Sequence, residues 1–107
     1  MKVNFAQVLE QLDGTPITGE NNAPFTLSMC AVNALLQPTT QTIPPIEKVR
    51  RARVAERVYE AGEIDISPED IVLIRECIGV WYPPLIVMKA YRLLGDDDGK
   101  ITVMKVV

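Results

Sequence analysis

Histidine is absent from this sequence, which removes the side chain that most often acts as a general base at neutral pH. The usual partner of a nucleophilic serine or cysteine and the commonest protein ligand for metals are missing with it. Neither a glycine-rich phosphate-binding loop nor a serine nucleophile elbow occurs in the 107 residues. The sequence therefore predicts a protein that is not an enzyme and that holds no metal and no cofactor.

Cysteine and long apolar runs are also scarce. Cys30 and Cys77 lie far apart, outside any Cys-x-x-Cys motif, and we interpret them as buried, reduced thiols. The chain begins without the apolar core of a secretion signal. The longest uncharged apolar stretch, residues 77–88, is interrupted by prolines and is shorter than the ~20 residues that span a bilayer. These features predict a cytoplasmic protein with no membrane segment.

Apolar residues, in contrast, make up 48% of the chain, although its net charge is −3. A chain of this length buries only about 60–65% of its unfolded surface, so part of the apolar surface stays outside the core. We expect that surface to meet a partner, either a second copy or another protein; the alternative is that a few large residues are simply exposed. The acidic balance disfavours a general nucleic-acid binder.

Four segments have helical periodicity, and proline, serine, threonine or glycine marks most of their ends: residues 27–37, 45–61, 68–81 and 84–94. Ser67 and Pro68 give the clearest start, with Asp70 placed to complete a capping box. Gly62 is expected to provide a left-handed cap after the second helix. We expect the second helix to bury one apolar face. The third helix has an apolar face of its own, which extends as far as Trp81. The residues of the second face are Ile46, Val49, Ala52, Ala55, Val58 and Tyr59.

The two ends of the chain favour extended structure. Asp13-Gly14 predicts a hairpin turn within residues 3–18, with a short helix over residues 4–12 as the alternative. Residues 101–107 have strand propensity and could pair with the N-terminal strand. The predicted fold is a single α+β domain over residues 1–107, mainly helical, with about four helices and a small hairpin or terminal-strand sheet. A flexible connector is expected at about residues 37–45, where prolines and threonines cluster.

A basic run in the second predicted helix is the most suggestive local feature. Arg50, Arg53 and Arg57 are spaced by three and four residues and share one helix face, with Lys48 close by. This arginine ridge could bind phosphates or, as the more favoured target, an acidic protein surface. The alternative is a solvated face in which the arginines pair with glutamates of the same helix: Glu47 with Arg51, Arg53 with Glu56, and Arg57 with Glu60.

A second candidate contact is apolar and comprises Tyr82, Leu85 and Met88, next to the Pro83-Pro84 break. Trp81 is expected to fill the core where two helices meet, whereas Tyr82 is equally well suited to the core and to the surface. Residues 96–99 superficially resemble a calcium loop. The spacing fails, because Lys105 stands where that loop needs a bidentate glutamate.

Three stretches resemble small accessory proteins of tailed bacteriophages and prophages: residues 12–17 (LDGTPI), 31–36 (AVNALL) and 82–87 (YPPLIV). The alanine-rich basic helix between them adds to the resemblance, which implies a bacterial cytoplasm and supplies no catalytic residues. The leading expectation is a non-catalytic phage or prophage accessory protein that binds another phage or host protein. The alternatives are a nucleic-acid-associated regulator and a homo-oligomeric assembly factor; a weaker likeness is to tail assembly chaperones.

Overall fold

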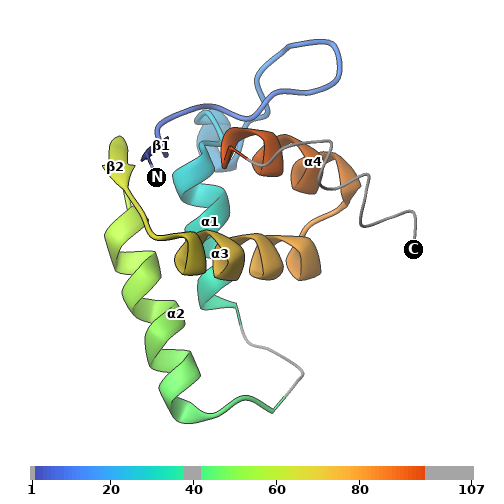
Figure 1. Cartoon of the computed structure of the whole chain (residues 1–107). Coiled ribbons are helices and arrows are strands. Elements are labelled where there is room, and N and C mark those ends of the chain that lie inside the picture. Colours follow the sequence, from blue (N-terminus) through green and yellow to red (C-terminus); the bar gives the residue numbers. More distant parts are fainter. Residues whose placement is uncertain (1, 38–41, 96–107) are drawn as a thin grey trace, which may run out of the picture.

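The computed structural model describes residues 2–37 and 42–95, which form four α-helices, a short 3₁₀ turn and two strands. The helices are α1 (Leu27–Leu36), α2 (Pro45–Val58), α3 (Pro68–Trp81) and α4 (Pro84–Leu93), and the strands are β1 (Lys2–Asn4) and β2 (Glu63–Asp65). Figure 1 shows α1 in the middle of the molecule, with α2 along one side and α3 crossing it. The predicted fold class, mainly helical α+β, is confirmed.

The core is one cluster of apolar side chains that collects around α1, since this helix packs against the other three. Phe5 and Leu9, which lie in the N-terminal segment, are fully buried in this core, as are Leu27 of α1 and Ile74 of α3. The inner stripe predicted for α1 is buried throughout: Leu27, Ala31, Ala34 and Leu35. The N-terminal segment is therefore an integral part of the core, on which the helices are assembled.

Residues 9–17 form a hairpin, which is shorter than the predicted range of 3–18, and the alternative helix over residues 4–12 does not form. The Ile17 amide donates to the Leu9 carbonyl at 2.9 Å, and the Gln11 amide donates to the Thr15 carbonyl at 2.8 Å. Gly14 adopts the φ of 88° that the turn requires. The side chain of Asp13 accepts two hydrogen bonds from Thr15, which lower the pKa of that carboxyl.

The sheet differs from the expectation. β1 pairs antiparallel with β2, so that Val3 lies opposite Ile64. Sequence patterning missed β2, because Glu63 and Asp65 flank a single apolar residue and suggest a loop. The predicted terminal strand at residues 101–107 and the calcium-like turn at residues 96–99 lie outside the described residues, as does 38–41 within the predicted connector.

The helix starts agree with the sequence better than the ends do. The hydroxyl of Thr26 accepts from the Met29 amide, and that of Ser67 accepts from the Asp70 amide, both at 3.2 Å. α2 ends at Val58, three residues earlier than predicted, and the residue with positive φ is Glu60 (51°), not Gly62. The prediction for Gly62 was wrong, because another element terminates this helix.

Ser28 of α1, which is 5% exposed, contacts the end of α2. Its hydroxyl donates to the Val58 carbonyl at 2.6 Å and accepts from the Glu60 amide at 2.9 Å. The Val58 carbonyl also accepts from the Ala61 amide at 3.2 Å, so the buried hydroxyl adds a second bond to this carbonyl and provides the partner of the Glu60 amide at the end of α2.

The predicted buried face of α2 is wrong for four of its six residues. Ala55 and Val58 are buried, together with Val54, whereas Ile46, Val49, Ala52 and Tyr59 are exposed. The reason is that the core touches α2 along one narrow strip, which is rotated away from the longer apolar stripe read from the sequence. Most of that stripe is left on the surface.

Trp81 also departs from the expectation, since it is 50% exposed at the end of α3. Tyr82, the next residue, packs against the core instead, where its ring meets Phe25 edge to face at 5.9 Å. The break at Pro83 turns the chain so that only one of the two neighbouring aromatic rings can face inward.

A close approach between α3 and α4 leads to a first prediction. A Cβ atom on Gly79 would lie 2.9 Å from the hydroxyl of Tyr91, which donates to the Arg75 carbonyl at 2.8 Å. We expect Gly79→Ala to lower the free energy of unfolding by about 1 kcal/mol, because the displaced hydroxyl loses its bond. In a Tyr91→Phe background the same change should raise it by up to ~1 kcal/mol, since alanine favours helix over glycine. Urea unfolding of the four proteins tests this reversal, and the same sign in both backgrounds would contradict it.

Candidate functional site

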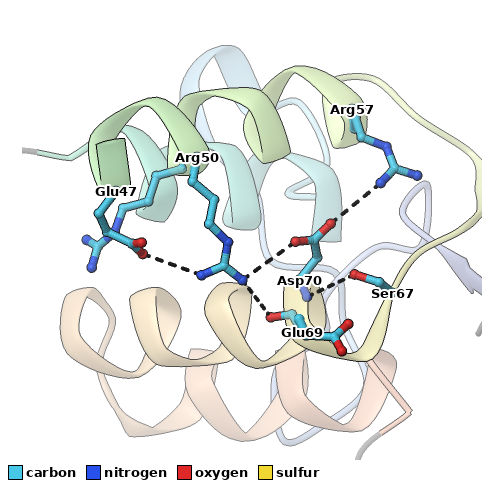
Figure 2. A network of polar contacts seen from close by, with 7 residues as sticks. Glu47, Arg50, Arg57, Ser67, Glu69 and Asp70 are labelled. Atoms are coloured by element: carbon cyan, nitrogen blue, oxygen red, sulfur yellow. Dashed lines mark hydrogen bonds and ion pairs between the residues drawn. The ribbon is translucent and has the colours of Figure 1, made fainter. Parts of the chain in front are cut away.

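Two arginines of α2 converge on one carboxylate at the start of α3 (Figure 2). Arg50 approaches Asp70 at 3.7 Å and Arg57 approaches it from the other side at 3.5 Å. Arg50 also donates to the Glu69 carbonyl at 3.2 Å, and Arg57 donates to the Asp65 carbonyl at 2.9 Å. These contacts fasten α2 to the first turn of α3 and to β2.

Asp70 therefore has a different role from the predicted one. Its amide donates to the hydroxyl of Ser67, which is one of the two hydrogen bonds of a capping box. Its carboxylate, however, faces the arginines, and no bond back to the Ser67 amide occurs among the described residues. A carboxylate in the first turn also stabilises the helix dipole. Sequence reasoning missed the arginine contacts, because the partners belong to separate helices and no local spacing links them.

Two arginines of the ridge, Arg50 and Arg57, thus form ion pairs that hold α2 against α3, whereas the third does not. Of the three ion pairs offered as the alternative, only Glu47 with Arg51 forms within the described residues, at 3.8 Å. Glu47 also approaches Arg50 at 3.6 Å. Arg53 lies between Arg50 and Arg57, is exposed, and has no hydrogen bond or ion pair in the described part of the chain.

Lys48 does not belong to the ridge. At 100° per residue it lies about 200° around the helix from Arg50. It is exposed and, like Arg53, has no ion pair within residues 2–37 and 42–95. It was grouped with the arginines because it is close to them in the sequence, but it belongs to another face of α2.

A groove runs beside Arg53, between α2 and the start of α3, with a volume of about 270 Å³. Apolar side chains form part of its lining, among them Ile46, which is 73% exposed, and Val49, which is 43% exposed. The charged lining consists of three arginines and two carboxylates: Arg50, Arg53, Arg57, Glu47 and Asp70. Because both carboxylates are already engaged by other arginines, the charge of Arg53 is uncompensated.

The predicted apolar contact is only partly available. Tyr82 is half-buried, and burial is the main reason why the pKa of its hydroxyl is raised. Leu85 and Met88, which lie on α4, are also half-buried. The exposed apolar groups nearby are Val80 (88%) and Trp81 (50%), which the sequence analysis did not select.

The two cysteines are free and buried. Burial raises the pKa of the Cys30 thiol to about 12 and also raises that of Cys77. Both shifts disfavour the reactive thiolate. Among the described residues, no group of three or more potential metal ligands comes together, and no helix is long and apolar enough to cross a membrane.

Comparison of the chain with protein-family models, with curated proteins and with solved structures gave no match. The candidate site therefore rests on its own geometry: a partly apolar groove in which one of three neighbouring arginines lacks a counterion.

Proposed function

We propose that this chain is a non-catalytic accessory protein of a tailed bacteriophage or prophage, and that it acts by binding an acidic segment of another protein. The observation that supports this proposal is the uncompensated charge of Arg53 in the groove between α2 and α3. The phage assignment draws on the resemblance described above and on no other observation.

The charge argument concerns spacing along α2. Arg53 is three residues from Arg50 and four from Arg57, and like charges at these spacings repel one another. Asp70 relieves this repulsion for the two outer arginines only. A ligand carboxylate that pairs with Arg53 would relieve the repulsion that this third arginine experiences. The free energy of binding would therefore include this relief as well as the attraction of an isolated surface ion pair.

The apolar part of the groove favours a protein segment over a phosphate backbone as the ligand. Ile46 and Val49 lie beside the arginines and offer contact to an apolar side chain. A phosphate backbone would use the charge and leave these side chains in water. A protein segment that combines acidic and apolar residues uses both, and the acidic balance of the chain also favours this class over nucleic acid.

Fluorescence anisotropy with a labelled peptide of alternating glutamate and leucine tests the proposal. We expect Arg53→Glu to weaken binding at least tenfold and wild-type binding to weaken as salt rises, since the contact is a charge pair at the surface. Lys89→Glu, on α4, makes the same change of net charge away from the groove and should leave the affinity within about twofold, because it removes only long-range attraction.

Two results would overturn the proposal. One is equal affinity for the glutamate peptide and for a matched glutamine–leucine peptide, because the arginine would then play no part. The other is preferential binding of a single-stranded oligonucleotide with a steep salt dependence, which would favour the nucleic-acid regulator instead.

A further inference from the structure

The face of α2 that was wrongly expected to be buried forms a continuous exposed stripe. It consists of Lys48, Val49, Ala52, Glu56 and Tyr59, all of them exposed. At 100° per residue these positions lie within about 60° of Ala52 on either side. The stripe is centred about 130° from the arginine ridge, and Val49, which also lines the groove beside the arginines, lies at the edge shared by the two surfaces.

A groove of about 430 Å³ lies along this stripe and is lined by residues of α1 and α2. Leu36, which is 57% exposed, and the half-buried Val32 form one wall. Ala52 and Ala55 form the floor, and Tyr59, 64% exposed, lies on the α2 side. The lining is apolar except for Glu56. Side chains as small as alanine let another helix approach closely.

The charges of the stripe are arranged symmetrically about Ala52. Lys48 lies four residues before it and Glu56 lies four residues after it. Neither of these two side chains has a hydrogen bond or an ion pair within the described residues. In an antiparallel pair of helices that face each other at Ala52, the residue four positions before this point is level with the residue four positions after it on the other helix.

We propose that this stripe is the interface of a homodimer, in which α2 packs antiparallel against α2 of a second copy around Ala52. A two-fold axis at Ala52 repeats each contact, so that Lys48 of each copy pairs with Glu56 of the other.

The charge pattern selects a second copy in this orientation. A parallel pair would bring Lys48 against Lys48 and Glu56 against Glu56, and like charges at an interface are unfavourable. An unrelated partner would need a complementary arrangement of its own, whereas a second copy already supplies one. The apolar groove and the symmetric charges thus indicate the same occupant.

Sedimentation equilibrium over a range of protein concentrations, with the whole chain, measures the dimer directly. We expect the wild type to dimerise. Lys48→Glu or Glu56→Lys should raise the dissociation constant at least tenfold, because in a dimer of either variant both of the contacts between residues 48 and 56 bring together side chains of like charge. An equimolar mixture of these two variants should return to within about threefold of the wild type. In the mixed dimer, one copy carries two glutamates and the other two lysines, so that both pairs are again opposite in sign. Lys89→Glu lowers the net charge by the same amount as Lys48→Glu and serves as the control for that variant.

Cross-linking tests the register independently. Ala52→Cys should form an intermolecular disulfide under mild oxidation, because the two copies of this residue meet at the axis. Val80→Cys, at a position 88% exposed at the end of α3, should not do so at the same protein concentration. The native Cys30 and Cys77 are buried and do not interfere.

A wild-type mass that stays monomeric up to the highest concentration would overturn the proposal. So would a dimer that withstands both charge reversals, or a mixture of the two variants that fails to recover. Cross-linking of Val80→Cys as readily as Ala52→Cys would equally contradict this register.

Discussion

Replacing Ser28 with alanine is expected to lower the free energy of unfolding by about 2 kcal/mol, because the change leaves the Glu60 amide without its partner and removes the shorter of the two hydrogen bonds to the Val58 carbonyl. The hydroxyl of Ser28 donates to the Val58 carbonyl and accepts from the Glu60 amide. The bond to the Val58 carbonyl is buried and the bond from the Glu60 amide is partly buried. Urea unfolding at neutral pH measures the loss.

Ser67 provides the matched control, since it is the other serine of the chain and also binds a backbone amide. It accepts from a single amide at the start of α3, whereas Ser28 makes a second, buried bond, so Ser67→Ala should cost about 1 kcal/mol, as is usual for the loss of an N-cap. If Ser28→Ala cost no more than Ser67→Ala, the hydroxyl of Ser28 would not be what ends α2. The left-handed conformation of Glu60, with a φ of 51°, would then account for the end of this helix.

The contrast between these serines also explains what the sequence could and could not predict. The cap of α3 depends on Ser67, Pro68 and Asp70, which are neighbours in the chain, and its position was predicted correctly. The end of α2 depends on Ser28, which is 30 residues from Val58. Gly62 was a reasonable local candidate, but a contact between two helices decided the outcome.

Burial on α2 shows the same limit in another form. Periodicity identified the helix and its apolar stripe, because both are properties of one segment. Which face the core covers depends on where α1 lies, and here the core covers Val54, Ala55 and Val58. The stripe around Ala52 and the ridge around Arg53 are the remaining two faces.

The candidate site was predicted in part. The sequence correctly placed Arg50, Arg53 and Arg57 on one face, since their spacing is local. It could not show that Asp70 would engage the first and the last and leave the middle one free. For the proposed function this division matters, because the outer arginines hold α2 against α3 and so fix the position of Arg53 beside the groove.

Raising the pH is expected to destabilise the protein through Cys30. The folded structure raises the pKa of this thiol from 9.0 to about 12, and the cause is burial. A pKa raised on folding stabilises the protein below the unfolded pKa, and this stabilisation is lost as the pH rises from 9 towards 12. The loss is about 1.4 kcal/mol per pH unit in that range, or roughly 2 kcal/mol by pH 10.5.

Urea unfolding at pH 8 and at pH 10.5, in the presence of a phosphine reductant, tests this sign and size. Cys30→Ala should be less stable than the wild type at pH 8, because the smaller side chain leaves a cavity, but it should lose less stability on the way to pH 10.5. Part of the alkaline loss remains in both proteins, since the pKa values of Cys77, Tyr59 and Tyr82 are also raised. Cys77→Ala serves as the comparison, and it should reduce the loss by less than Cys30→Ala does, because Cys77 is 6% exposed whereas Cys30 is fully buried. Equal losses in the wild type and in Cys30→Ala would mean that water reaches Cys30, and that the packing of α1 at the centre of the core is looser than its buried stripe indicates.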